Sequence, residues 1–410
     1  MQYELLYSRK ESECRCKQMP PKMSFSQTVI DCDEISQSEL NIDDKVRSNL
    51  FAWNGQFSPQ FIEVLLSKYS KSGFFVVDPF VGSGTVLGEC ARQGLKAYGV
   101  ELNVSAYYMA KTYEIANLSI ERRNEVIERI DALFLSIAND DSIIETITSE
   151  IEKSEPDVYH NLLCTTVILL DIFYNDVTLE LLRKKWDLLK NVISQIPVSR
   201  ERIIAERGDS RYIKLKDKCA DLLVTSPPYI NVFNYHQKYR RSVEALGYNV
   251  LSIAKTEFGS NRKNRGNRFL TVIQYCIDMA LSLKEACRIC KTDARMIYVV
   301  GRESSVLGYS FCNSELVFNI GTEIFSLKFL LRQERVFKNR FGQMIYEDIL
   351  HFSNSSSILP CDEEIICKAR EIAVRMLQEK CNLDVENKNR PLLFEAIEKA
   401  IKIKPSEGIA

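Results

Sequence analysis

Apolar positions between residues 74 and 100 predict two strands joined by a helix. Residues 74–77 form a short, wholly apolar run, which is typical of a central parallel strand covered on both faces. Residues 86–93 have the spacing of a helix, and Gly94 is suited to end it. Residues 95–100 are expected to form a second strand. We therefore expect a strand, a turn, a helix and a second strand in this order.

Similar patterns continue along the rest of the chain. Helical spacing is found at residues 120–137, 177–193 and 269–290, and further strands are expected at residues 296–301, 325–332 and 344–352. Strands that alternate with helices favour an α/β fold with a mainly parallel sheet. We expect a Rossmann-like, doubly wound sheet of about seven strands, with the last two strands forming an antiparallel edge hairpin.

These patterns divide the chain into a central domain and three additions. The expected regions are an N-terminal arm at 1–47, a catalytic α/β domain at 48–114 and 201–352, a helical insertion at 115–200 and a helical C-terminal segment at 353–410. A compact fold would need only one helix where the insertion stands. The insertion could recognise a binding partner, form a dimer face or brace the sheet, and the sequence does not choose among these roles.

Composition excludes several classes of protein. The 410 residues are 45% hydrophobic and 27% charged, and the net charge is −1, so no overall electrostatic field marks a nucleic-acid partner. The sequence has no apolar run of about eighteen residues and no signal-peptide pattern, so we expect a cytoplasmic protein. Thirteen cysteines are expected to be reduced, and only three histidines are present. Cys287 and Cys290 lack a second pair, so no metal site is expected.

The turn after the first strand has the features of a nucleoside site. Residues 78–85 read Asp-Pro-Phe-Val-Gly-Ser-Gly-Thr, and Gly82 and Gly84 allow the backbone to turn tightly against a ligand. Glu101 follows the second strand, where an acid can bind ribose hydroxyls. The chain has no Gly-Lys-Ser/Thr for a nucleotide phosphate, and Leu87 stands where a dinucleotide turn needs a third glycine.

A second motif ends another apolar strand, at residues 221–229. Ser226-Pro227-Pro228-Tyr229 combines two fixed φ angles, two missing backbone donors and an aromatic ring. Ser226 precedes proline and is therefore pushed toward an extended conformation. Carbonyl groups with few local partners, beside an aromatic face, suit a planar group that carries an amine. A strand that runs into an ordinary surface turn is the alternative interpretation.

Together the two motifs resemble those of S-adenosylmethionine-dependent DNA amino-methyltransferases, which methylate the exocyclic amine of cytosine or adenine. Residues 51–61 resemble the segment that closes over the methionine end of the cofactor, and residues 207–210 the element whose Asp meets its adenine amine. The resemblance covers about half the chain. The implied cofactor contacts are Phe57, Ser58, Asp78, Pro79, Phe80, Gly82, Ser83, Gly84, Thr85, Glu101, Leu102, Asn103, Asp209, Ser210 and Ser226.

The resemblance also implies roles for the second motif. The implied catalytic residues are Ser226, Pro227, Pro228 and Tyr229: Ser226 and the Pro227 carbonyl would hold the amine, and Tyr229 would stack on a base that has left the duplex. Serine before Pro-Pro favours cytosine N4, since family members with Asp or Asn there mostly methylate adenine N6. Adenine N6, an RNA substrate and a non-catalytic nucleic-acid-binding protein remain alternatives. No Pro-Cys motif for carbon-5 methylation stands out.

A basic stretch follows the second motif. Residues 231–268 hold eight Lys or Arg from Lys238 onward against two Glu, and they predict contact with double-stranded DNA. The implied DNA contacts are Asn231, Asn234, Tyr235, His236, Arg240, Arg241, Arg262, Lys263, Arg265 and Arg268. We expect a monomer or dimer in a restriction-modification system, acting on the same DNA site as a restriction endonuclease without a stable complex.

Overall fold

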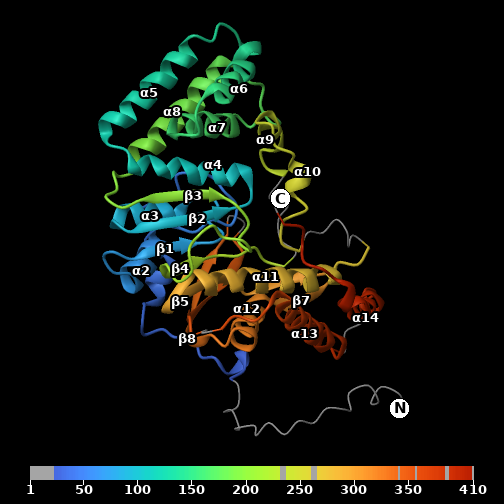
Figure 1. Cartoon of the computed structure of the whole chain (residues 1–410). Coiled ribbons are helices and arrows are strands. Elements are labelled where there is room, and N and C mark those ends of the chain that lie inside the picture. Colours follow the sequence, from blue (N-terminus) through green and yellow to red (C-terminus); the bar gives the residue numbers. More distant parts are fainter. Residues whose placement is uncertain are drawn as a thin grey trace, which may run out of the picture.

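A seven-stranded sheet lies at the centre of the molecule, with the strand order β3-β2-β1-β4-β5-β9-β8 (Figure 1). The computed structural model describes residues 23–230, 237–259, 266–339, 342–355, 358–383 and 387–408. The strands are β1 (Phe75–Asp78), β2 (Lys96–Glu101), β3 (Ile203–Arg207), β4 (Ala220–Thr225), β5 (Cys290–Gly301), β8 (Lys328–Lys338) and β9 (Met344–Ser353). β1 to β5 lie parallel, whereas β9 is antiparallel to both neighbours. The predicted Rossmann-like fold with an antiparallel edge hairpin is confirmed.

Each central strand supplies side chains to two separate cores. Val76 and Leu222 belong to one core, and their chain neighbours Val77 and Leu223 belong to the other. Successive residues of a strand point to opposite faces of the sheet, so a wholly apolar strand needs cover on both faces. This requirement explains why the strands read as continuous apolar runs in the sequence.

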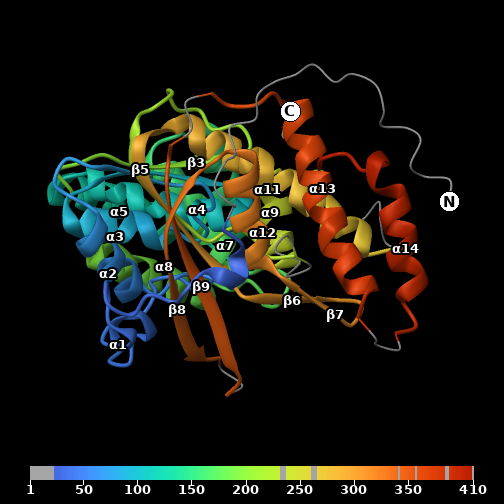
Figure 2. The same ribbon diagram turned by 90° about the horizontal axis from the view of Figure 1, so that it is seen from below.

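Helices cover both faces of the sheet (Figure 2). One face is covered by α2 (Pro59–Tyr69), α3 (Thr85–Gln93) and α4 (Val104–Thr112). The other is covered by α11 (Phe269–Ile289) and α12 (Asn313–Asn319), with α13 (Asp362–Cys381) and α14 (Arg390–Lys399) packed against α11. None of the helices within the described ranges is both long and apolar enough to span a membrane.

Four helices follow the α4 segment and form a layer beyond β3 (Figure 1). They are α5 (Ile120–Leu135), α6 (Ile143–Lys153), α7 (Val158–Leu170) and α8 (Leu179–Gln195). α7 is buried almost all round because it packs between α4 and the other three helices. The guanidinium of Arg123 is buried and donates to the carbonyls of Ile196 and Pro197, which fixes the start of α5 against the end of α8.

Two features depart from the expected elements. The hairpin β6 (Glu303–Val306) and β7 (Tyr309–Cys312) turns through Leu307 and Gly308, which both have positive φ. Strands this short leave little alternation to detect in a sequence. β8 begins later than residue 325 because the π-helical turn Ile320–Ile324 and a bond from the Leu327 N–H to the Gly321 carbonyl precede it, and it extends beyond residue 332 to Lys338.

Candidate active site

The two sequence motifs lie side by side at the carboxyl ends of two central strands of the sheet. β1 and β4 are hydrogen-bonded neighbours, and the strand order reverses between them. Ligands of open α/β sheets bind outside the carboxyl ends of the strands at such a reversal. The Thr225 hydroxyl at the end of β4 donates to Asp78 at the end of β1, over 2.5 Å. This bond ties the glycine-rich turn to the Ser-Pro-Pro-Tyr segment, and the sequence did not single out Thr225.

The glycine-rich turn has no room for side chains at Gly84. This residue has φ 98°, and a Cβ there would stand 2.6 Å from the ring of Tyr113 and 2.9 Å from the Cα of Ala110. Both distances are shorter than any real contact, and the φ value itself disfavours other residues. Gly84 therefore lets α3 begin directly against α4, and it presents the first backbone N–H groups of α3 toward the sheet edge.

Glu101 is hydrogen-bonded to the glycine-rich turn. One carboxylate oxygen accepts from the Gly82 N–H and the other from the Asn103 N–H, each over 2.8 Å. Burial raises the pKa of Glu101 to about 7, although these two backbone bonds lower it. Burial also raises the pKa of Asp78 to about 7, against the bonds from Thr225 and the Phe80 N–H. Two carboxyl groups that titrate near neutral pH therefore meet at this edge.

The aromatic segment that precedes α2 covers the turn. A Cβ on Gly82 would stand 3.7 Å from the Trp53 ring, and the Ser83 hydroxyl donates to the Gln56 side chain over 2.5 Å. Gln56 in turn donates to the Phe51 carbonyl. Trp53 and Gln56 hold the segment against the glycine-rich turn, although the sequence suggested only Phe57 and Ser58 as contacts.

Some expected cofactor residues have structural partners. Phe57 is buried and packs against Phe61, with ring centroids 5.8 Å apart. The Asn103 side chain caps α4 by accepting from the Ser105 and Ala106 N–H groups. Phe57 and Asn103 thus help to shape this edge through packing and capping, and a contact with the cofactor stays a prediction for both.

Asp209 is part of a buried ionic network. Arg211 donates to both carboxylate oxygens of Asp209, with a shortest distance of 2.6 Å, and to Asp278 over 2.8 Å. The same guanidinium donates to the Ser406 and Glu407 carbonyls, so the C-terminal segment packs beside this element. The Arg211 side chain and the Arg211 backbone N–H, which bonds to Asp209 over 2.9 Å, fix the direction of this carboxylate, and its contact with the cofactor amine stays a prediction.

Two buried hydroxyl groups near the carboxyl ends of the strands have no hydrogen-bond partner, and they indicate whether this site can hold a polar cofactor. Ser58 and Ser210 were both expected to contact the cofactor, and each has a buried hydroxyl that makes no hydrogen bond within the described part of the chain. Buried polar atoms normally have partners, so each unpaired atom needs an explanation. A ligand with donor and acceptor groups would provide one, and the residues present therefore fit a nucleoside cofactor.

The Ser-Pro-Pro-Tyr segment is held from three sides. Tyr275 of α11 donates to the Pro228 carbonyl over 2.7 Å, and Asn313 accepts from the Ile230 N–H over 3.2 Å. The Tyr229 ring lies over Gly301, where a Cβ would stand 2.6 Å from it. The Ser226 hydroxyl lies 3.5 Å from the Tyr229 hydroxyl. Glycine at the end of β5 is thus needed for the position of this tyrosine.

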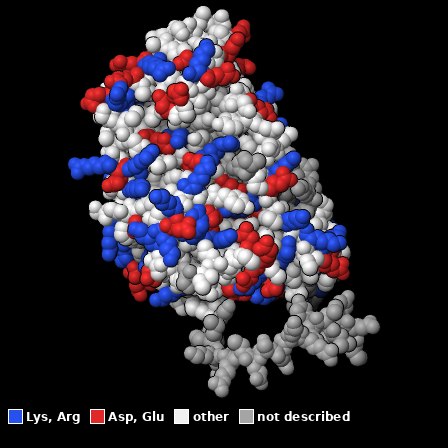
Figure 3. Space-filling view, in the orientation of Figure 1, with Lys and Arg blue, Asp and Glu red and all other residues white. Residues whose placement is uncertain are grey.

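Only part of the predicted DNA surface lies in the described ranges. Asn231, Asn234, Tyr235, His236, Arg262, Lys263 and Arg265 lie outside the described residues. Arg240 and Arg241 are exposed on α9 (Arg240–Ala245), whereas Arg268 is half-buried just before α11. Arg240 bonds to Glu244 over 2.8 Å, and Arg241 stacks on the Phe173 ring. Lysines, arginines and acids intermix over the face shown in Figure 3, in keeping with the net charge of −1.

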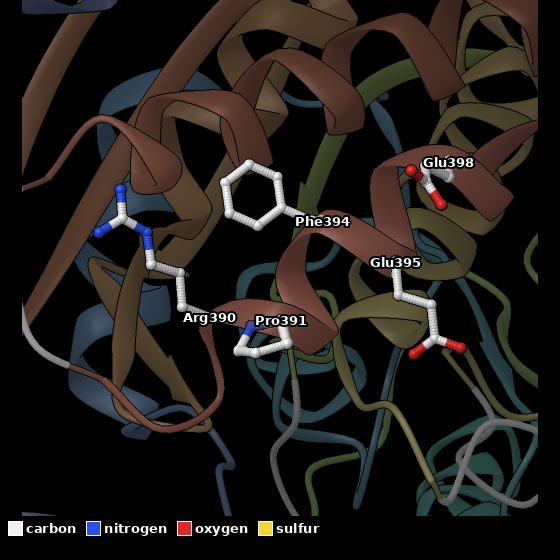
Figure 4. Close-up of a pocket in the computed structure, with 5 residues that line it drawn as sticks. All are labelled: Arg390, Pro391, Phe394, Glu395 and Glu398. Carbon is white, nitrogen blue, oxygen red and sulfur yellow. The ribbon is translucent and has the colours of Figure 1, made fainter.

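A separate surface hollow of about 490 Å³ lies on α14 (Figure 4). Its lining residues are Arg390, Pro391, Phe394, Glu395 and Glu398. None of the expected site residues lines it, and two of its five residues are acidic, so we assign it no role. Within the described ranges, no three His, Cys, Asp or Glu side chains are grouped to hold a metal ion.

Comparison with known proteins links the chain to enzymes that methylate DNA. Residues 5–112 match a family model described as DNA methylase, of the N6 and N4 type. A curated relative, the Type II methyltransferase M.MjaII of Methanocaldococcus jannaschii, is 26% identical over 106 residues. That match covers 25% of this chain and only 19% of the relative, so the chain spans about a fifth of the relative's length.

Two of the solved structures that match the chain do so at low identity and with low TM-scores. A SAM-dependent methyltransferase from Methanosarcina mazei is 11% identical with a TM-score of 0.34, over 72% of this chain and 98% of that one. A geranyl diphosphate C-methyltransferase from Streptomyces coelicolor is 8% identical with a TM-score of 0.32, over 72% and 78%. The family match spans β1, the glycine-rich turn and Glu101, and it confirms the resemblance: residues 5–112 are similar to the N6/N4 DNA methylase family.

Proposed function

We propose that the protein transfers a methyl group from S-adenosylmethionine to the N4 amine of a cytosine in double-stranded DNA. The observation that carries this proposal is the bond between Thr225 and Asp78, which joins a nucleoside-binding turn to an amine-binding motif at one strand-order reversal. A cofactor site and a substrate site on neighbouring strands can share one reaction centre. The N4 preference rests on Ser226.

The residues of this candidate active site would have the following roles. Glu101 would accept from the ribose hydroxyls, and the Ser58 and Ser210 hydroxyls would bond to other polar groups of the cofactor. S-adenosylmethionine supplies an electrophilic methyl group. Ser226 and the Pro227 carbonyl would accept from the amine and localise its lone pair, while the Tyr229 ring would support the base. After transfer the nitrogen releases one proton to solvent, so no strongly basic side chain is required.

Nucleoside analysis tests which base is modified. The protein is incubated with labelled S-adenosylmethionine and duplex DNA of mixed sequence, and the DNA is then digested to nucleosides. We expect the label in N4-methylcytosine. Label in N6-methyladenine would replace the proposal by the adenine alternative, and label found only with an RNA substrate would replace the DNA substrate.

A partner endonuclease is proposed only by analogy with restriction-modification systems.

Cofactor affinity should depend on pH through Glu101. Burial gives this carboxyl a pKa of about 7 in the free protein, and ribose hydroxyls bind best to the ionised form. The dissociation constant of S-adenosylmethionine should therefore fall roughly tenfold for each unit of pH up to about 7 and stay level above it. Isothermal titration at several pH values measures this. The Glu101→Gln variant should bind S-adenosylmethionine weakly, and its dissociation constant should not depend on pH. If the dissociation constant of this variant still falls as the pH rises to about 7, the pH dependence belongs to Asp78.

The exposed arginines of α9 are expected to contact DNA phosphates. Replacing Arg240 and Arg241 by Gln should lower the slope of log K against log salt concentration by about 1 to 2, because each lost phosphate contact removes about 0.9. Arg122→Gln is a matched control, since Arg122 is also an exposed helical arginine paired with a nearby Glu. Equal slopes in the wild type and the double variant would show that α9 does not contact DNA.

A further inference from the structure

A half-buried carboxylate, Glu347, lies behind the tyrosine of the Ser-Pro-Pro-Tyr segment. In the β5–β9 register Glu347 stands opposite Gly301, the residue over which the Tyr229 ring packs. A side-chain hydrogen bond from Tyr229 lowers the pKa of Glu347, and the Tyr229 hydroxyl lies 3.5 Å from the Ser226 hydroxyl. A series of three polar side chains therefore leads from the carboxyl end of β4 into the protein: Ser226, Tyr229 and Glu347.

Arg335 of β8 stabilises the charge on Glu347. Its guanidinium bonds to the Glu347 carboxylate over 3.0 Å, and the two side chains are only 9% and 15% exposed. The same guanidinium donates to the Leu40 carbonyl and packs over the rings of Phe61 and Phe337. Burial raises the pKa of Glu347, whereas Arg335 and Tyr229 lower it. A buried carboxylate with such a partner can stay ionised.

An ionised Glu347 fixes the direction of the two hydrogen bonds that link it to Tyr229 and Tyr229 to Ser226. A carboxylate can only accept, so the Tyr229 hydroxyl must donate to it. The phenolic oxygen then has only lone pairs left, and the Ser226 hydroxyl can bond to it only by donating its own hydrogen. This leaves the lone pairs of the Ser226 oxygen for a substrate N–H. The buried charge thus makes Ser226 an acceptor, which is the role that an amine substrate requires.

We propose that Glu347 is a positioning residue that acts through Tyr229 to hold Ser226 as a hydrogen-bond acceptor for the substrate amine. The inference rests on the proposed methyl transfer, and it adds a residue that lies far along the chain from both motifs. Glu347 touches neither the substrate nor the cofactor in this account. Its effect should therefore be on the rate of transfer and should depend on the Tyr229 hydroxyl.

A double-mutant cycle tests this dependence. Glu347→Gln replaces the acceptor by a group that can also donate, and it should lower the single-turnover rate of methyl transfer roughly 10- to 100-fold. The dissociation constant of S-adenosylmethionine should not change. Tyr229→Phe keeps the ring but removes the link, so adding Glu347→Gln to Tyr229→Phe should cost nothing further. Equal losses in both backgrounds would overturn the proposal, because they would indicate a purely structural role.

A control and a second readout separate this inference from the proposed function. Glu334→Gln breaks another arginine–glutamate pair of β8, the pair with Arg302, and should leave the rate unchanged. In protein with 3-fluorotyrosine at position 229, Glu347→Gln should shift the fluorine resonance and Glu334→Gln should not. A protein without methyl transfer that still shows this shift would refute the proposed function but keep the Tyr229–Glu347 link. An unchanged resonance in Glu347→Gln would refute the link itself.

Discussion

Ser226→Ala is expected to lower the rate of methyl transfer by roughly 100-fold or more. The hydroxyl at the end of β4 is the group that would accept from the amine as positive charge develops on the nitrogen. Alanine has no acceptor but fits the same space, so the strand and the two prolines should stay in place. Single-turnover transfer of labelled methyl to duplex DNA measures the effect, with equilibrium binding of S-adenosylmethionine measured in parallel.

Ser226→Thr provides the matched comparison, since it keeps a hydroxyl on a slightly larger side chain. It should retain more activity than the alanine variant, and both variants should bind S-adenosylmethionine with a dissociation constant within about threefold of wild type. If Ser226→Ala weakens cofactor binding as much as it slows transfer, Ser226 belongs to the cofactor site and does not bind the amine.

Gly84→Ala is expected to destabilise the fold by about 3 kcal/mol and to weaken cofactor binding with it. The added Cβ would stand 2.6 Å from the Tyr113 ring and 2.9 Å from the backbone of Ala110, at a φ of 98°. Strain of this kind and overpacking each cost on the order of 1 to 3 kcal/mol. Urea unfolding measures the loss of stability, and titration with S-adenosylmethionine measures the loss of affinity.

Gly94→Ala separates the two sources of the expected cost. Gly94 ends the same helix with φ 66°, but a Cβ there meets nothing within 4 Å. Only the cost of the left-handed backbone conformation remains, so the free energy of unfolding should fall by about 1 kcal/mol. The affinity for S-adenosylmethionine should not change. If the two variants unfold at the same urea concentration, the close contact of α3 and α4 at Gly84 contributes nothing to stability.

The sequence contains most of the information for the cofactor half of the site. Gly82, Gly84 and Glu101 lie within one strand–turn–helix–strand unit, so their spacing along the chain already determines how they meet. The match over residues 5–112 covers the same unit. Local patterns of this kind can be recognised because the interacting residues are close in sequence.

The substrate half depends on contacts that no local pattern contains. Thr225 meets Asp78 because β4 lies beside β1, and Tyr229 meets Gly301 and Glu347 because β5 and β9 follow in the sheet. These pairings come from strand order and register, which the spacing of apolar residues does not specify. Asn103 caps α4 through bonds from the N–H groups two and three residues further along the chain, and its contact with the cofactor stays a prediction.

The helical insertion contacts both the sheet domain and α9. Among its four helices, α7 packs on α4, and α4 packs on β2 and β3. The loop that follows α7 also reaches α9, where the Ile172 N–H bonds to the Ser242 hydroxyl and Arg241 stacks on Phe173. The insertion therefore supports the helix on which two of the predicted DNA contacts lie.

The central claim is that the glycine-rich turn and the Ser-Pro-Pro-Tyr segment form one reaction centre. The most direct test is a single-turnover reaction of the wild-type protein, preloaded with methyl-labelled S-adenosylmethionine, with unmodified duplex DNA. We predict label in the DNA, recovered as N4-methylcytosine, at a rate that Ser226→Ala reduces without loss of bound cofactor. Bound cofactor with no label in any DNA would contradict the claim.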